Sequence, residues 1–184
     1  MINQALRTFR EAKHVDHHGD VEDPLSGLIG RRGFAGRAQR ALGMHLRPAS
    51  ALMIIEIDHF ETITARFGSN CGDMVIRGVA QQLLQMVRGN DVVGRIDTTT
   101  FAVLHTEIDL AAVRTVGERL RRSVQSMGFF AEDGSAIPVT VSIGVEVVVR
   151  TSRPEAPNLE GLISQALDRV GDARRAGCNR VAAA

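Results

Sequence analysis

The stretch DVVGRIDTTTFAVLH, residues 91–105, decides the fold. Two largely apolar runs, 91–96 and 100–105, flank a short polar segment, which is the pattern of a β-hairpin. The second run has few polar side chains and predicts a buried strand. Between the runs stand Asp97 and three consecutive threonines, where short hairpin turns usually carry glycine. This turn is therefore unusual in chemistry as well as in shape.

Helices and strands are predicted on both sides of the hairpin. The expected helices cover about residues 23–46, 72–87, 110–125 and 159–175, with a short one that starts near residue 58. The other expected strands are ALMIIEI (51–57) and PVTVSIGVEVVV (138–149). This order predicts an α/β (α+β) fold with a mainly antiparallel central sheet flanked by helices.

The composition favours an ordinary soluble globular domain over a nucleic-acid-binding or membrane protein. The 184 residues carry a net charge of +1 and no Trp or Tyr, so a strong basic field and the usual stacking platforms are both absent from the sequence. No apolar run is long enough to span a membrane, and the N-terminus lacks a signal-peptide core. Cys71 and Cys178 have no metal-like spacing, and two reduced thiols are favoured over a disulfide. The expected location is the cytoplasm.

Residues 1–22 differ from the remainder and predict a short amphipathic helix followed by a linker. Ile2, Leu6 and Phe9 share a helical spacing, and a polar run follows them. The following side chains in that run have the chemistry of metal ligands: His14, Asp16, His17, His18 and Asp20. A solvated linker is the favoured interpretation. Residues 23–184 are expected to form the domain.

Six segments together resemble the GGDEF domain family, whose active members, the diguanylate cyclases, join two GTP molecules into cyclic di-GMP. The segments are DPLSGLIGRRGF (23–34), IEIDHFETI (55–63), FGSNCGD (67–73), RGNDVVGRIDTTTF (88–101), VTVSIGV (139–145) and ARRAGCN (173–179). They follow one another in the family order and cover the chain from about residue 23 to residue 181. The resemblance implies a nucleotide-cyclase, palm-like fold.

The resemblance also implies that the catalytic residues are degenerate. Active members carry Gly-Gly-Asp/Glu-Glu-Phe at the turn, where this sequence has Asp97, Thr98, Thr99, Thr100 and Phe101. In the family, metal ions are held by the first acid of a D-x-D strand and by the third turn residue. Glu56 and Asp58 stand at the strand, but Thr99 is neutral. We therefore expect no bound Mg²⁺, no cofactor and no cyclase activity.

Other positions of the family's nucleotide site have also changed. Glu61 replaces a phosphate-binding lysine, Thr64 replaces a guanine-reading asparagine, and Cys178 replaces an arginine. Arg174 stands at a lysine position and keeps its positive charge, and Asp73, a guanine contact in the family, is present.

A second family site is retained in sequence. Arg88 and Asp91 match the RxxD site that binds cyclic di-GMP as an inhibitor, and Arg119 matches its second arginine. Placed on their helices, both arginines fall outside the apolar stripes and reach solvent. Arginine forks bind guanine or phosphate, and a carboxylate accepts hydrogen bonds from guanine. The alternative is that Arg88 is a helix C-terminal cation and Asp91 a solvated turn residue.

These features favour a catalytically inactive receptor for cyclic di-GMP, which reads the ligand through Arg88, Asp91 and Arg119 and acts on another signalling domain or protein. One alternative is a nucleotide-independent module for protein interaction or homodimerisation. Another is a residual enzyme or GTP sensor that uses Glu56, Asp58 and Asp73.

Overall fold

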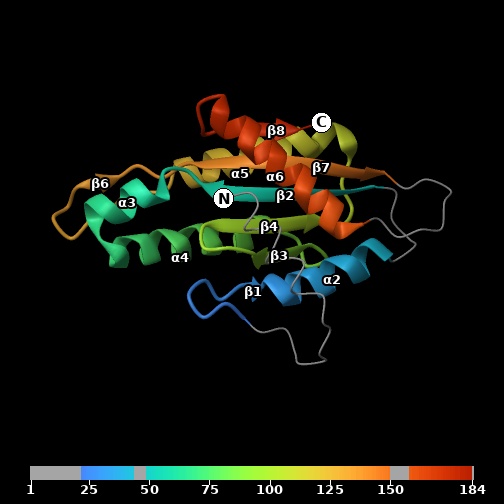
Figure 1. Cartoon of the computed structure of the whole chain (residues 1–184), viewed down its shortest axis with the longest axis horizontal. Helices are drawn as coiled ribbons and strands as arrows, with labels where there is room; N and C mark the ends of the chain where they lie inside the picture. Colours follow the sequence, from blue (N-terminus) through green and yellow to red (C-terminus); the bar gives the residue numbers. More distant parts are fainter. Residues whose placement is uncertain (1–21, 44–48, 150–157, 184) are drawn as a thin grey trace.

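The computed structural model describes residues 22–43, 49–149 and 158–183, and its centre is a six-stranded sheet in the order β1-β3-β4-β2-β7-β8 (Figure 1). The strands are β1 (Ile29–Gly30), β2 (Ala49–Ile57), β3 (Val92–Arg95), β4 (Thr100–His105), β7 (Val141–Val149) and β8 (Val181–Ala183). The helices are α2 (Arg31–Gly43), α3 (Phe60–Phe67), α4 (Ser69–Met86), the 3₁₀ turn η1 (Leu110–Ala112), α5 (Val113–Gln125) and α6 (Leu159–Arg175). A separate small hairpin joins β5 (Phe129–Phe130) and β6 (Ala136–Ile137).

The sheet is mixed. Its inner pairings, β3 with β4, β4 with β2 and β2 with β7, are antiparallel, whereas β1 and β8 add parallel strands at the two edges. The predicted hairpin is confirmed, with Arg95 opposite Phe101. The α+β fold is confirmed as well, and the parallel edges are the part of the topology that the strand pattern did not predict.

Helices cover both faces of the sheet (Figure 1). One face packs against α3, α4 and α5, and the other packs against α2 and α6. Because side chains alternate along a strand, β4 sends Phe101 and Val103 to the first face and Ala102 and Leu104 to the second, and all four are buried. This burial on both faces explains the nearly continuous apolar run that the hairpin sequence shows.

Helix α6 lies directly on β7 at Gly144. A Cβ atom built on Gly144 would be 2.0 Å from the carbonyl oxygen of Ala166 and 2.7 Å from the amide nitrogen of Val170, both in the backbone of α6. Nearby, the buried Glu146 of β7 makes an ion pair with Arg169 of α6. The glycine therefore permits a close approach of helix and sheet, and the ion pair holds the helix there.

The first helix begins later than predicted. Residues 23–28 form a turn, and α2 starts at Arg31 instead of Asp23. The Asp23 carboxylate accepts hydrogen bonds from both the amide and the hydroxyl of Ser26, and Gly27 has a φ of +70°. An aspartate that closes a turn in this way resembles a helix N-cap in sequence, which is why the prediction placed the helix start there.

Smaller differences concern element ends and short strands. Helix α4 begins at Ser69, three residues before the predicted start, and β7 begins at Val141 instead of residue 138. The strands β1, β5, β6 and β8 were not predicted, since two or three residues are too few to show a period. The predicted N-terminal helix lies outside the described residues. Both cysteines are free, and no described helix is long and apolar enough to cross a membrane.

Candidate functional site

The turn between β3 and β4 closes at one end of the sheet without a left-handed residue. Asp97 and Thr100 exchange backbone hydrogen bonds, from Asp97 N–H at 3.2 Å and from Thr100 N–H at 3.4 Å. Thr98 donates its amide to the Asp97 carboxylate at 2.8 Å. None of the residues 97–100 has a positive φ. Three of the four turn amides are thus already bonded within the turn, which leaves no array of free amides to hold a phosphate.

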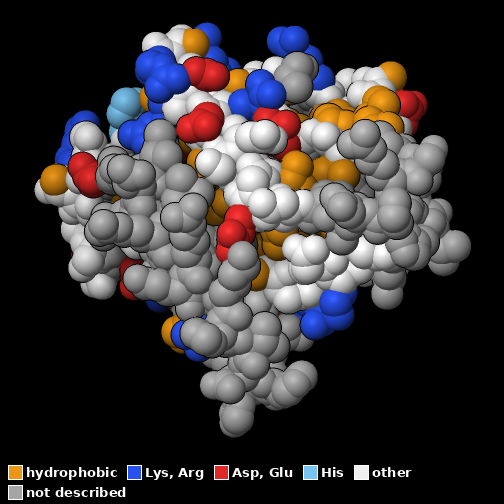
Figure 2. Space-filling view, turned by 45° about the vertical axis from the view of Figure 1, so that its right-hand side comes forward, with side chains coloured by type: hydrophobic (Ala, Val, Ile, Leu, Met, Phe, Trp, Pro, Cys, Tyr) orange, Lys and Arg blue, Asp and Glu red, His pale blue; other side chains and the backbone are white. Residues whose placement is uncertain are grey.

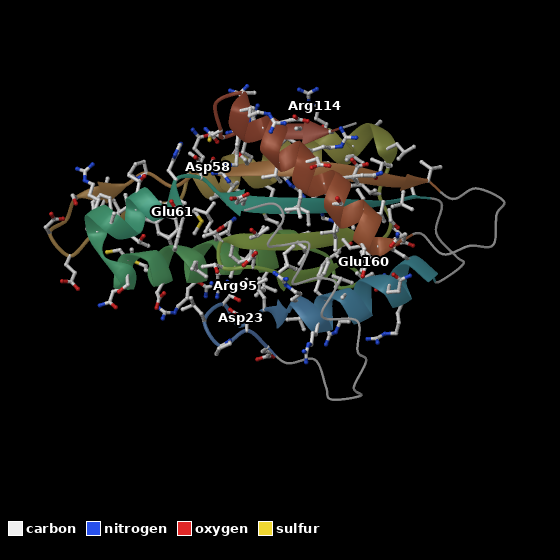
Figure 3. All side chains as sticks on the ribbon, viewed as in Figure 1. Asp23, Asp58, Glu61, Arg95, Arg114 and Glu160 are labelled. Carbon is white, nitrogen blue, oxygen red and sulfur yellow. The ribbon has the colours of Figure 1, made fainter. Side chains whose placement is uncertain are left out.

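Two arginines that sequence reasoning did not single out fix this turn. Arg95 donates to the carbonyl of Thr98 at 2.7 Å and to the carboxylate of Asp23 at 2.8 Å, so it ties the turn to the segment before β1 (Figure 3). Arg31, at the start of α2, lies 3.5 Å from the Asp97 carboxylate. The turn is therefore held by charged contacts from both flanking segments.

Glu56 at the end of β2 is paired with Arg174 in the last turn of α6. The guanidinium Nη1 lies 2.6 Å from Glu56 Oε1, and the Glu56 side chain is 19% exposed. Burial raises the pKa of Glu56, and Arg174 opposes that rise. The strand acid that the family resemblance assigns to a metal ion therefore has a protein cation as its partner.

Asp58 is buried, and both of its carboxylate oxygens accept hydrogen bonds. It is 3% exposed, and its carboxylate accepts hydrogen bonds from the Thr140 hydroxyl at 2.7 Å, the Ser142 hydroxyl at 2.7 Å and the Asn179 amide at 2.9 Å. These donors come from the start of β7 and from the loop after α6. Asp58 thus fastens the C-terminal loop to the sheet (Figure 3).

The positions that match the guanine contacts are not arranged to read a base. Thr64 of α3 donates its hydroxyl to carbonyls of its own helix, at 3.1 Å to Glu61 and 3.3 Å to Phe60. Its methyl group packs against α4, since a Cβ on Gly72 would lie 2.6 Å from it. Asp73 is exposed and makes a 3.7 Å ion pair with Arg77. Of the predicted guanine contacts, only the Asp73 carboxylate has spare acceptor capacity.

The residues at this end of the sheet do not fit a divalent metal ion. Mg²⁺ requires free oxygen ligands at about 2.0–2.1 Å in octahedral geometry. Glu56 is paired with Arg174, Asp58 is surrounded by donors, and Thr99 brings no charge. Among the described residues no cluster of three or more His, Cys, Asp or Glu side chains could hold a metal. The candidate ligands among His14 to Asp20 lie outside the described residues.

The RxxD segment lies at the opposite end of the sheet. Arg88 is exposed and follows the last residue of α4 by two positions, so it stands in a turn beyond the helix. Asp91 is buried, with a side chain that is 6% exposed. Its carboxylate accepts the amide of Arg88 at 3.0 Å, the amide of Thr106 at 3.3 Å and Nδ1–H of His105 at 2.9 Å. Asp91 is therefore not a solvated turn residue but the anchor of the turn that presents Arg88.

The Asp91 contacts predict a specific acid sensitivity. Burial alone would raise the pKa of Asp91, but the hydrogen bonds from His105, Arg88 and Thr106 outweigh it and lower the pKa below its ordinary value of 3.8. A lowered folded-state pKa stabilises the fold above the unfolded-state value, and that stability is lost as pH falls through the folded-state pKa. We expect the stability difference between the wild type and Asp91→Asn to shrink below about pH 3.8. Urea unfolding between pH 7 and 3 measures this, with Asp73→Asn as the exposed control, and a constant difference would contradict it.

Arg119 lies beside the turn that carries Arg88. Helix α4 runs toward the His105 end of β4, because β3 follows it there, and α5 runs away from that end. The antiparallel pair is fixed by a hydrogen bond from Gln82 to Ser123. One turn along from that contact in each helix are Met86 on α4 and Arg119 on α5, so Arg119 lies against the C-terminal turn of α4. Within the described residues, neither the Arg88 nor the Arg119 guanidinium has a hydrogen-bond or ion-pair partner.

Comparison with known proteins agrees with this architecture. A sequence model of the family "Diguanylate cyclase, GGDEF domain" matches residues 21–180. The chain belongs to the GGDEF domain family. Diguanylate cyclase DosC of Escherichia coli is 30% identical over 183 residues, which cover 98% of this chain and 39% of that protein. The chain spans less than half the length of curated relatives that it matches.

Solved GGDEF structures share the fold. The GGDEF domain of DgcB from Caulobacter crescentus in complex with cyclic di-GMP superposes with a TM-score of 0.80 at 24% identity, over 92% of this chain and 98% of that one. Diguanylate cyclase SiaD from Pseudomonas aeruginosa, in complex with its activator SiaC, also gives a TM-score of 0.80 at 25% identity, over 99% of this chain and 67% of that one.

Several residues that shape this GGDEF domain were missed in the sequence. His105 and Ser142 lie in otherwise apolar strands and Thr140 directly precedes β7, and the three side chains hold the two buried aspartates. A polar residue inside an apolar run does indicate a buried hydrogen bond, but its partner is distant in sequence and cannot be named from the pattern.

Figure 2 shows that basic and acidic side chains are intermixed on the face in view. In the upper part of that face Lys or Arg side chains lie near Asp or Glu side chains, in keeping with a net charge of +1. The net charge of +1 gives no general basic field around the two exposed arginines of the RxxD end.

Proposed function

We propose that this GGDEF domain is catalytically silent and serves as a receptor for cyclic di-GMP at the RxxD end of the sheet. The observation that carries the proposal is the pair of exposed guanidinium groups, Arg88 and Arg119, on adjacent segments and without partners in the described residues. Arginines without an internal partner lose no ion pair when they bind an anionic ligand.

The chemistry of the ligand suits this pair. Cyclic di-GMP has two guanines, whose O6 and N7 accept a guanidinium fork, and two phosphates, which do so as well. Asp91 contributes by holding the turn that presents Arg88. A direct contact from Asp91 to guanine, as the family resemblance implies, would have to compete with the three donors that its carboxylate already accepts.

The geometry of the other end of the sheet supports the absence of synthesis. Phosphodiester formation in this family needs carboxylates that are free to hold metal ions and a turn that can approach a triphosphate. Here Glu56 is paired, Asp58 is buried among donors, Thr99 and Thr100 replace the acids, and three of the four turn amides are bonded internally. The presence of cyclic di-GMP in the DgcB complex supports the choice of ligand, since the two domains share a fold.

Calorimetric titration with cyclic di-GMP tests the receptor role. We expect saturable binding by the wild type and at least about a tenfold loss of affinity in Arg88→Ala and in Arg119→Ala, because hydrogen bonds to charged groups contribute about 1.5–3 kcal/mol. Arg77→Ala is the matched control: Arg77 is an exposed arginine of α4 that already pairs with Asp73, and its loss should leave the affinity unchanged.

Two results would count against the proposal. Absence of heat with the wild type at high cyclic di-GMP concentration would leave a nucleotide-independent interaction module as the better interpretation. The second test is incubation of the domain with GTP and Mg²⁺ or Mn²⁺. If chromatography detects cyclic di-GMP among the products, the domain is an enzyme.

A further inference from the structure

The pairing of Glu56 with Arg174 joins two departures from the family pattern. At the strand position an aspartate has become the longer Glu56, and at the α6 position a lysine has become Arg174. Each change lengthens the side chain or widens its charged group, and together they bring Nη1 within 2.6 Å of Oε1. Either change alone has no evident reason, whereas the two together make one ion pair across 118 residues of sequence.

The second acid at this end has an arginine too. Asp97, at the first turn position, lies 3.5 Å from Arg31. The third acid, Asp58, is buried and accepts hydrogen bonds from Thr140, Ser142 and Asn179. Each of these three carboxylates is therefore either paired with a guanidinium or hydrogen-bonded to several donors.

We propose that Arg174 takes the place of a metal ion as the resident counter-ion of Glu56. The domain would then bind a divalent cation at this edge only weakly even with an acid restored at the turn. Two features therefore oppose metal binding at this edge. Thr99 has no charge, and the remaining strand acid, Glu56, is already paired with the Arg174 cation.

The physical reason is competition for one carboxylate. Arg174 lies in the last turn of α6, where a positive charge is also favoured by the helix dipole, so its position is stabilised independently of Glu56. An arginine is charged at every accessible pH and cannot leave by deprotonation. A divalent ion would have to displace the guanidinium, shed its own water and then accept an arginine as its neighbour.

Titration with Mn²⁺, monitored by electron paramagnetic resonance, separates the effect of the missing turn acid at Thr99 from the effect of the Glu56–Arg174 ion pair. We compare Thr99→Asp, which restores one turn acid, with the double variants Thr99→Asp/Arg174→Gln and Thr99→Asp/Arg175→Gln. Arg175 is the neighbouring arginine, exposed and paired with Asp172, and serves as the matched control. We expect the Arg174 double variant to bind Mn²⁺ at least tenfold more tightly than Thr99→Asp, and the Arg175 double variant to match Thr99→Asp.

Equal Mn²⁺ affinity of Thr99→Asp and Thr99→Asp/Arg174→Gln would overturn the proposal, whether both bind the metal or neither does. Circular dichroism and thermal melting establish that each variant is folded, and Arg174→Ala provides a second, smaller replacement in the same background. The cyclic di-GMP titration concerns the other end of the sheet, so this inference and the receptor proposal fail independently.

Discussion

Replacing Gly144 by alanine is expected to lower the free energy of unfolding by about 3 kcal/mol, the upper part of the range for overpacking a core. The added methyl group would meet the Ala166 carbonyl oxygen at 2.0 Å and the Val170 amide nitrogen at 2.7 Å. Both are backbone atoms of α6, so no side-chain rotation relieves the contact. The whole helix would have to move away from β7 and would weaken its ion pair between Arg169 and Glu146.

Urea unfolding monitored by circular dichroism measures this effect, and Gly36→Ala is its control. Gly36 lies inside α2, where a Cβ would meet only the end of Arg40 at 3.6 Å. Alanine there should raise the stability by about 0.5–1 kcal/mol, because glycine is a poor helix former. If Gly144→Ala lowers the free energy of unfolding no more than a surface substitution does, α6 does not pack on β7 as closely as described.

Asp58→Ala is expected to cost about 3 kcal/mol of stability, the range for removing one partner from a buried charged network. The substitution leaves the hydroxyls of Thr140 and Ser142 and the amide of Asn179 without their acceptor. The loop after α6 would lose its attachment to β7. The C-terminal strand β8 should then exchange its amide hydrogens faster than β2, which hydrogen exchange detects.

Asp73→Ala is the control for this prediction, since Asp73 is exposed and has a single, long ion pair. Its removal should change the free energy of unfolding by less than about 0.5 kcal/mol. Equal effects of the two substitutions would show that Asp58 is not the anchor of the C-terminal loop.

The long elements of the fold were predictable because each carries its own pattern. Helix α6 covers the predicted residues 159–175; in the structure Asn158 caps its first turn and Gly177 follows its last. The hairpin followed from two apolar runs around a polar turn. The start of α2 was predicted wrongly because Asp23 bonds to Ser26 in a turn, and turn and cap use the same residues. The parallel edge strands β1 and β8 depend on contacts with β3 and β7 that no local pattern contains.

The candidate site was predictable in identity but not in contacts. The family pattern located Glu56, Asp58 and Asp91 by position alone. It could not show that Glu56 would meet Arg174 or that Asp91 would turn inward to His105, because these partners are 118 and 14 residues away in the sequence. A motif gives the chemical type of a side chain, whereas its hydrogen-bond partners are decided by tertiary packing.

The turn at residues 97–100 affects the unfolded chain as well as the folded one. Glycine samples more backbone conformations than aspartate or threonine in the denatured ensemble, so forming this hairpin gives up less entropy than forming one with a glycine pair, by roughly 0.4–1 kcal/mol for each position. Asp97 and Thr98 adopt ordinary backbone angles and incur no strain in exchange. Asp97 and Thr98 thus make the chain stiffer at this turn than a glycine pair would, and this stiffness favours the folded hairpin.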